Sequence, residues 1–306
     1  MDFKTFKKSS SMMDRLKKEI ESINNPPKES FTDERVWYPE LDKAGNGQAT
    51  IRFLPPPAVD VAVNKDALPW SRIFVHSFKG PTGKWYINNS LTSLGKRVKD
   101  PLSEYNSKLW NEVDDDNSPQ RKQARAQKRK LRYYSNILVV SDPKHPENEG
   151  KVFLFGYGKK IFDKISVAMN PTFEGDEKIN VFDFFEGANF RLRVRKVEGY
   201  PNYDLSTFEA KKPLSDDDVY LEQIWRQEYS LTEFLDPKNF KTYDELKKQL
   251  EEVLEIQLDQ KPAPLTLVEK KTPKPIPKLD DDHDNTPPWS DVDDDPDVAN
   301  FRSMAQ

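Results

Sequence analysis

The strongest constraint on the fold of this chain is a series of short apolar segments separated by turn signals. They lie at residues 49–54, 72–78, 84–87, 134–140, 152–155 and 190–197. A run of prolines, 55–57, ends the first segment, and the turn 79–83 (KGPTG) joins the second to the third as a predicted hairpin. Many short strands at close spacing predict a small β-barrel or β-sandwich.

Helical periodicity marks three further segments, 159–168, 216–228 and 243–256. The last of them carries an apolar stripe formed by Leu246, Leu250, Val253 and Leu254. The middle one is expected to bury the side that holds Val219, Tyr220, Ile224 and Trp225. The predicted fold class is therefore mainly β with added helices, an α+β protein.

The composition narrows the class of protein. The chain contains no cysteine, which excludes disulfides, thiolate zinc sites and cysteine nucleophiles. No apolar run approaches the ~18 residues of a membrane span, and no signal-peptide pattern opens the chain, so we expect a soluble, intracellular protein without a membrane partner. Proline and lysine dominate residues 258–279, which predicts a semi-extended linker.

The net charge of −4 hides a polarity along the chain. Residues 280–306 carry nine Asp and one Arg, a charge of −8, so residues 1–279 carry +4. An acidic appendage on a basic body is typical of an interaction tail, and such a tail can compete for the cationic surface of its own protein.

A basic run at residues 121–132 (RKQARAQKRKLR) carries seven cations in twelve residues, and Tyr133 and Tyr134 follow it at once. Cations suit phosphates and flat rings suit unstacked bases, so this pattern indicates binding of single-stranded nucleic acid without readout of its sequence. The alternative is a solvated helix face. A predicted strand adds Arg191, Arg193 and Arg195 on one face, where they would repel one another unless they meet an anion.

Motifs for catalysis are missing. The glycines of 45–50 (GNGQAT) and 156–161 (GYGKKI) fit neither a dinucleotide fingerprint nor a phosphate loop. With three His, no Cys and no paired acid and base, we expect that the protein is not an enzyme. The acidic run 114–116, just before the basic run, is expected to cap a helix or to lie in a solvated turn.

Several longer blocks resemble a known family, the single-stranded DNA-binding, helix-destabilising replication proteins of T-even-type bacteriophages. The blocks are LDKAGNGQATIRFLP (41–55), GKWYI (83–87), NILVV (136–140), PENEGKVF (146–153), GKKI (158–161) and EGANF (186–190). They run in family order across residues 36–205, the match thins from 206 to 257, and the tail is similar only in composition.

The resemblance implies four regions. They are a basic N-terminal arm for cooperative binding (1–30), an oligonucleotide-binding (OB-fold) core (31–257) with an inserted subdomain at about 70–132, the linker (258–279) and an acidic partner-binding tail (280–306). By motif position, the DNA groove would contain Arg52, Trp85, Tyr105, Trp110, Lys128, Arg129, Lys130, Tyr133, Tyr134 and Phe190, to which we add Arg191 and Arg193. The cooperativity motif is similar to Lys7, Lys8, Ser9 and Ser10. In the tail, Asp293, Asp294, Asp295, Trp289 and Phe301 are the partner-binding candidates.

The family's zinc site is implied to consist of one His and three Cys. The positions that correspond to it hold His76, Ser90, Asp100 and Ser103. Serine hydroxyls are poor ligands for zinc at neutral pH, and one His with one Asp is too few for a closed structural site. We therefore expect no cofactor, and expect packing of Leu91, Leu94, Val98 and Leu102 to hold this segment instead.

The expected function is cooperative, sequence-independent binding of single-stranded DNA in phage DNA replication, recombination and repair, in the cytoplasm of the infected bacterial host. Expected partners are single-stranded DNA, further copies along the strand, and replisome and recombination proteins bound by the tail. Two alternatives remain: an RNA-binding OB-fold protein that regulates translation, and a scaffold that acts through its acidic tail.

Overall fold

The computed structural model describes residues 33–258. The predicted N-terminal arm with Lys7–Ser10, the linker beyond residue 258 and the acidic tail with its partner-binding candidates lie outside the described residues. No helix in the described part is long and apolar enough to cross a membrane.

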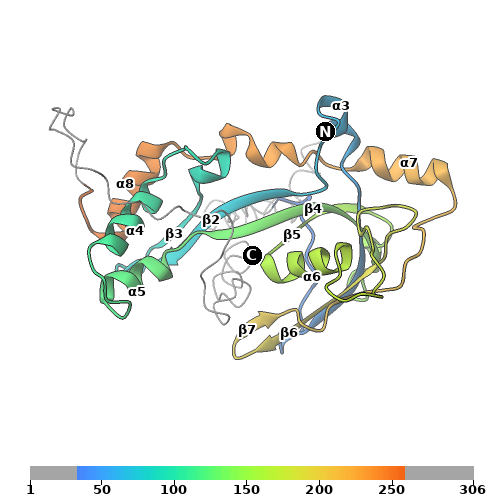
Figure 1. Cartoon of the computed structure of the whole chain (residues 1–306), viewed down its shortest axis with the longest axis horizontal. Coiled ribbons are helices and arrows are strands. Elements are labelled where there is room, and N and C mark those ends of the chain that lie inside the picture. Colours follow the sequence, from blue (N-terminus) through green and yellow to red (C-terminus); the bar gives the residue numbers. More distant parts are fainter. Residues whose placement is uncertain (1–32, 259–306) are drawn as a thin grey trace, which may run out of the picture.

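Within residues 33–258 the eight strands pair in antiparallel fashion, in the order β3-β2-β4-β1-β6-β7, with β5 on β4 and β8 on β6, and Val36 adds an isolated parallel bridge to Leu154. The strands are β1 (Gly47–Phe53), β2 (Ser71–Lys79), β3 (Trp85–Asn89), β4 (Lys130–Ser141), β5 (Val152–Tyr157), β6 (Phe190–Val197), β7 (Tyr200–Asn202) and β8 (Thr207–Phe208). The sheet curls into a half-barrel, an arrangement compatible with an OB-like fold (Figure 1).

Helices of two kinds surround this sheet. The α-helices are α3 (Ala58–Val63), α4 (Pro101–Asn111), α5 (Pro119–Ala126), α6 (Lys159–Met169), α7 (Asp218–Gln227) and α8 (Tyr243–Leu254). Short 3-10 turns are η1 (Leu91–Leu94), η2 (Pro146–Asn148), η3 (Thr232–Leu235) and η4 (Pro237–Asn239). The β2–β3 hairpin extends away from the half-barrel to the end where α4, α5 and α8 gather (Figure 1).

Strand β4 joins the half-barrel to the hairpin. Its residues 133–138 pair with β5, which occupies one edge. Strand β2 pairs with residues 130–134 of β4, and β1 pairs with residues 137–141. Both stretches overlap the one that pairs with β5, so β2 and β1 lie one after the other on the opposite edge of β4. Because β1 and β2 follow each other along one edge of β4, the hairpin can leave the half-barrel as a separate projection.

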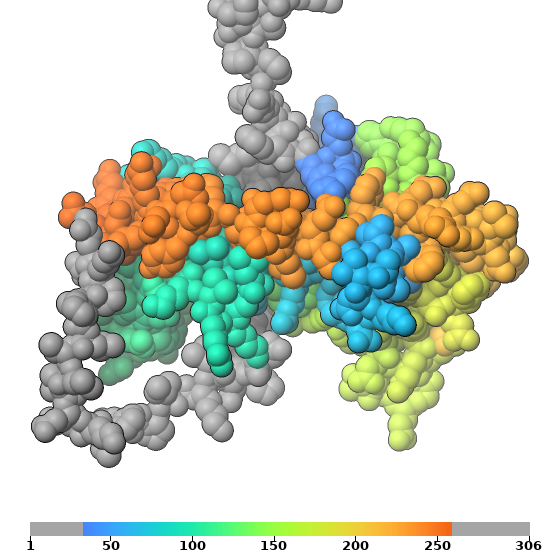
Figure 2. Space-filling model, turned by 90° about the horizontal axis from the view of Figure 1, so that it is seen from above, coloured from blue at the N-terminus to red at the C-terminus, as the bar shows by residue number. Residues whose placement is uncertain are grey.

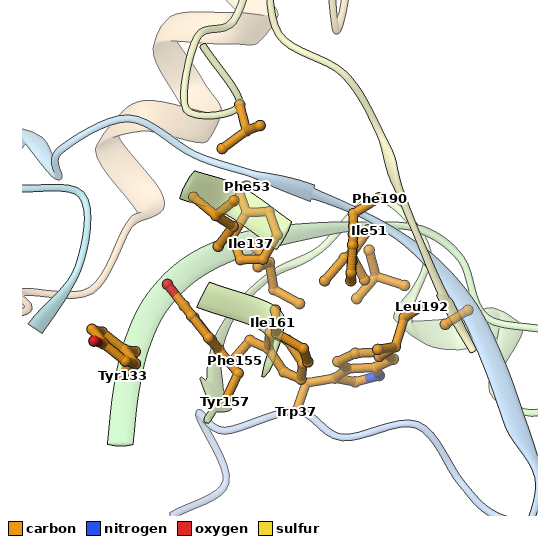
Figure 3. Close-up of a cluster of buried hydrophobic side chains, with 14 of the residues drawn as sticks. Trp37, Ile51, Phe53, Tyr133, Ile137, Phe155, Tyr157, Ile161, Phe190 and Leu192 are labelled. Atoms are coloured by element: carbon orange, nitrogen blue, oxygen red, sulfur yellow. The ribbon is translucent and has the colours of Figure 1, made fainter. Parts of the chain in front are cut away.

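The half-barrel encloses an aromatic core. Phe53, fully buried on β1, lies 5.7 Å from the rings of Tyr157 and Phe182 and 5.8 Å from that of Phe190 (Figure 3). Tilted and edge-on pairs of this kind stabilise a core beyond the area that they bury. Helix α6 closes one side by burying Ile161 and Ile165.

A second core lies at the far end of the hairpin. Phe78 and Tyr86 stack there at 5.3 Å, and Leu102 of α4 is fully buried beside them. The other side of this core is α8, whose buried residues are Leu246, Leu250, Val253 and Leu254. A capping box fixes the start of α8, since the Thr242 hydroxyl accepts from the Glu245 amide and the Glu245 carboxylate accepts from the Thr242 amide.

Residues 214–258, the C-terminal belt, cross from the half-barrel to the second core; they carry the orange colours in Figure 2. Near the half-barrel, the Asn136 amide donates to the Tyr229 carbonyl (2.8 Å) and accepts from its N–H (3.0 Å). Near the hairpin, the Asn88 amide donates to Gln249 at 3.2 Å. The belt therefore fastens both cores to one another.

Most predicted elements are confirmed, with three differences. Helix α7 buries Ile224 and half-buries Tyr220 and Trp225, so the predicted apolar side is confirmed except at Val219, which is 65% exposed. Val98 is 37% exposed rather than packed. Helices α4 and α5 were missed, although each begins with a capping residue followed by proline, Asp100 and Ser118.

Candidate nucleic-acid interface

The basic run 121–132 spans three structural elements. Helix α5 carries Arg121, Lys122 and Arg125, the following connection carries Lys128 and Arg129, and β4 begins with Lys130 and includes Arg132. Lys122, Arg125, Lys128 and Arg129 are exposed. The run is therefore neither one helix face nor one strand, and its cations are spread over α5, the turn that follows it and the start of β4. We call residues 121–132 with Trp110 the basic surface.

Trp110, at the end of α4, is 39% exposed and lies under two of these cations. The guanidinium carbons of Arg121 and Arg125 lie 4.6 Å and 5.3 Å from its ring centroid. Cation–π contacts of this type hold a ring in a defined orientation while leaving part of it open to a stacking partner.

Arg129 forms a second cation–ring contact. Its guanidinium carbon lies 4.0 Å from the centroid of Phe74 on β2, and its Nη1 donates to the Thr92 hydroxyl at 2.6 Å. The neighbouring Lys130 donates to the Ser77 carbonyl at 3.3 Å. These contacts position the side chains along the hairpin, next to the second core.

Tyr105 and Trp85 are both half-buried. Tyr105 lines a hollow of about 390 Å³ together with Phe78, Lys79, Pro81, Gln123, Ala126, Gln127, Leu254 and Ile256. The hollow lies beside the basic surface and combines aromatic walls with a lysine. Such a site can accept a flat ring next to an anionic backbone.

Arg52, Tyr133 and Phe190 lie in the interior instead. The Arg52 Nη2 donates to the carbonyls of Asp183 (2.8 Å) and Lys212 (3.0 Å), and burial lowers the pKa of Arg52 to about 10 despite the nearby Asp183 charge. Tyr133 stacks at 4.0 Å on Phe162 of α6. With relative exposures of 0%, 7% and 0%, these predicted groove residues offer no surface to a ligand in this conformation.

Tyr134 has a partner within the chain as well. Its ring stacks on that of Phe234 in the C-terminal belt, with 4.2 Å between the centroids. The predicted stacking candidate therefore faces the belt rather than the basic surface.

The arginines of β6 form a separate surface. Alternate burial of Phe190, Leu192 and Val194 leaves Arg191, Arg193 and Arg195 exposed on one face, as the sequence predicts. The anion that Arg191 meets is Glu209, at 2.6 Å. Arg191 pairs with Thr50 of β1, and Thr50 pairs with Ser141 at the end of β4. Lys130 is the first residue of β4, so roughly 36 Å measured along this strand separates the β6 arginines from the start of β4.

The four positions of the implied zinc site come together, but as a hydrogen-bonded cluster around Asp100. One carboxylate oxygen, Oδ2, accepts from the Ser90 hydroxyl and the Leu91 amide, both at 3.0 Å. The other, Oδ1, accepts from the Ser103 amide at 2.9 Å and lies 3.3 Å from His76 Nε2. Burial acts to raise the pKa of Asp100, but His76 and the two backbone amides outweigh it and lower that pKa.

This donor set would offer a zinc ion one imidazole, one carboxylate and two serine hydroxyls, which is a poor set for a closed structural site. Both Asp100 oxygens accept from protein donors, whereas His76 Nε2 makes no hydrogen bond among the described residues and His76 Nδ1 lies 3.2 Å from the Gln127 carbonyl. Within residues 33–258 no group of three or more His, Cys, Asp or Glu side chains is arranged to hold a metal ion.

Comparison with known proteins identifies the family. Residues 45–254 match the family model described as "gp32 DNA binding protein like". The chain belongs to this family. It is 39% identical over 228 residues to the single-stranded DNA-binding protein of Enterobacteria phage T2, which covers 74% of this chain and 72% of that protein. It is 36% identical over 252 residues to the protein of the same name from Enterobacteria phage T4, covering 81% and 79%.

The residues of this chain that match the family model, 45–254, include every surface described above. They include the basic surface, the β6 arginines, the cluster around Asp100 and the greater part of the C-terminal belt. Sequence reasoning missed the contacts of Phe74 and Thr92 with Arg129, because they join residues 37 and more positions apart. It also missed the role of the acidic run 114–116, which lies next to the α5 arginines.

Proposed function

We propose that this protein binds single-stranded DNA without reading its sequence during phage DNA replication. The observation that carries the proposal is the basic surface, where the guanidinium groups of Arg121 and Arg125 lie over the half-exposed ring of Trp110, in a member of the gp32-like family. The proposed interface contains Trp85, Tyr105, Trp110 and Lys128–Lys130, with the α5 arginines. Arg191 and Arg193 belong to a second basic surface that a longer strand could reach.

The mechanism is non-catalytic. Capture of phosphates by Lys and Arg releases counterions, and bases that stack on exposed rings contribute about 1–3 kcal/mol each. Because the protein binds the open strand and not the duplex, it destabilises the duplex by mass action.

The finer parts of the proposal rest on the family resemblance and on charge. We propose an OB-fold core, cooperative binding through the N-terminal arm, partner recruitment through the acidic tail, and further roles in recombination and repair in the host cytoplasm. The arm and tail carry opposite charge, which suits both self-association and contact with other proteins.

We also propose that the inserted subdomain is stable without a metal. The support is the Asp100 cluster, in which Asp100 accepts hydrogen bonds from Ser90 and Ser103 and lies next to His76, and the second core, in which α8 packs on the hairpin. Both features cross-link the segment in the way that a structural ion would.

The test is a salt-resolved titration of the full chain with single-stranded DNA, comparing Lys128→Ala/Arg129→Ala/Lys130→Ala with a control of equal charge. The control, Lys65→Ala/Arg226→Ala/Lys238→Ala, removes three exposed cations that are not part of the basic surface. We expect the first variant to weaken binding and to flatten the log–log salt dependence by about 0.7 per lost phosphate contact, with an unchanged melting temperature. The control should bind like the wild type.

Four outcomes would overturn the assignment. An affinity that does not change with salt would show that the basic surface does not contact phosphates. Equal loss of affinity in both variants would show that only the total charge of the protein matters. Tighter binding of RNA than of DNA of equal length would favour the translational regulator. Capture of proteins without any oligonucleotide affinity would favour the scaffold.

A further inference from the structure

The α4–α5 connection places an acidic side chain on the basic surface. Asp116 Oδ1 lies 2.6 Å from Arg121 Nη1 and 3.3 Å from Arg125 Nη2, and the Asp116 carbonyl accepts from Arg125 Nη1 at 2.7 Å. Asp114 adds a longer contact, 3.7 Å, to Arg121. One carboxylate therefore engages two of the seven cations of the basic run.

These are the same two arginines that lie over Trp110. Arg121 is fixed further by its Nε, which donates to the Trp110 carbonyl at 3.3 Å, and its side chain is only 14% exposed. The Asp116 side chain is 67% exposed. The cations are thus held in place by the protein, whereas the anion that they bind faces solvent and can be exchanged.

A phosphate group can replace this carboxylate. Arg binds both anions through the same planar array of N–H donors, and an exposed ion pair contributes little to folding stability. Asp116 Oδ1 contacts the two guanidinium groups that lie over the Trp110 ring, so a strand phosphate in its place would leave its base near Trp110.

We propose that Asp116 is a built-in competitor of DNA, which occupies this phosphate position in the free protein and leaves it when a strand binds. The inference rests on the proposed function and deepens it, because it names the two arginines that gain a phosphate and the residue that limits their affinity. It is independent of the acidic tail, since Asp116 lies within the described core.

Asp115 provides a matched control in the same turn. Its carboxylate accepts from the Asn117 amide at 2.9 Å, and within residues 33–258 it forms no ion pair with Arg121 or Arg125. Asp116→Asn and Asp115→Asn remove the same charge at adjacent positions and keep an acceptor oxygen. Any difference between the two variants therefore reports the specific contact with the arginines.

The experiment measures binding of a short oligothymidylate to the full chain at several salt concentrations. We expect Asp116→Asn to tighten low-salt binding about two- to fivefold and to steepen the log–log salt dependence by up to about 0.7, with a smaller change for Asp115→Asn. In an Arg125→Gln background, Asp116→Asn should lose part of its effect, because the two residues act through one contact. Melting temperatures confirm that each variant is folded.

Equal gains for the two aspartate variants would assign the effect to long-range charge and overturn the proposal. Weaker binding by Asp116→Asn would also overturn it, since Asp116 would then position the arginines for DNA. Absence of any single-strand affinity in the wild type would reject the proposed function itself, which is a different result from binding that Asp116 does not affect.

Discussion

Glu228 ends α7 with a carboxyl group that is buried and has no hydrogen-bond partner among the described residues. Burial, with the charge of Asp60, raises its pKa from 4.5 to about 9. Asp60 itself is well satisfied, because it accepts from the Ser230 hydroxyl at 2.6 Å and from the Leu231 amide at 2.8 Å. Folding therefore favours the protonated form of Glu228.

The pH dependence follows from the sign of that shift. Between pH 4.5 and about 9 the folded state holds a proton on Glu228 that the unfolded state releases. The free energy of unfolding therefore falls as the pH rises through this range, as far as this residue determines it.

Glu228→Gln removes the ionisable group and keeps its shape. We expect the variant to gain stability over the wild type as the pH rises from 5 to 8, by about 1–3 kcal/mol at the upper end. Urea unfolding at several pH values measures the difference. Glu222→Gln, on the exposed face of the same helix, is the control and should show no such trend. A gap that is constant with pH would contradict the assignment of the raised pKa.

At the scale of elements, α8 and the β2–β3 hairpin depend on one another. Leu250 is fully buried in the second core, where Phe78 and Tyr86 contribute from the hairpin. Gly80, in the hairpin turn, lies so close to the Val253 backbone that an added Cβ would come within 2.2 Å of its carbonyl oxygen. The turn therefore requires glycine for this close approach of two backbones.

Leu250→Ala is expected to lower the free energy of unfolding by about 2–5 kcal/mol, because it leaves a cavity in a core that cannot collapse around it. Val219→Ala, at an exposed position of α7, should change it by less than about 0.5 kcal/mol. Chemical denaturation of both variants measures the two values. A small effect of Leu250→Ala would show that α8 is not part of a cooperative core.

The proposal that the inserted subdomain is stable without a metal predicts a further result. The purified protein should contain no stoichiometric zinc by elemental analysis, and a strong chelator should leave its melting temperature unchanged, because hydrogen bonds engage both Asp100 oxygens. One zinc ion per chain would contradict this expectation and would require His76 to be examined as a ligand.

The elements could be predicted from sequence where their pattern is local. The alternation along β6 and the stripe on α8 follow from periods of two and about 3.6 residues, so both were found. The interior position of Arg52 could not be found in this way, because its acceptors at Asp183 and Lys212 lie 131 and 160 residues away. For the same reason the candidate site was predicted as one groove, whereas the fold separates the β6 arginines from the basic run.

At the scale of the whole molecule, charge is segregated along the chain. The tail, 280–306, carries −8 and the remaining residues carry +4. A proline-rich tether gives such a tail a high local concentration near the body. We therefore expect the tail to compete with DNA for the cationic surface, as Asp116 is proposed to do at the basic surface.

Deletion of residues 280–306 is expected to tighten binding of a short oligonucleotide at low salt and to abolish recruitment of replication proteins. Because the competition is largely Coulombic, the difference should disappear as ionic strength rises. Titrations of the two chains at several salt concentrations provide the measurement. Equal affinity at low salt would show that the tail serves partners alone.

Deletion of residues 1–11 is expected to lower cooperativity on long strands far more than affinity for a short oligonucleotide. The physical reason is that Lys7 and Lys8 would contact a neighbouring copy, which only a long strand supplies. Binding isotherms on both lengths make the comparison. Equal losses would instead make the arm a simple phosphate contact.

The C-terminal belt also sets an order of events during synthesis. Thr82, in the hairpin turn, donates to the carbonyl of Val253, which is added to the chain 171 residues later. At about 5–20 residues per second, roughly 9–34 s pass between these two residues on the ribosome. Throughout that interval the apolar side of the hairpin has no α8 to cover it, so the newly made hairpin is the segment most in need of protection from aggregation.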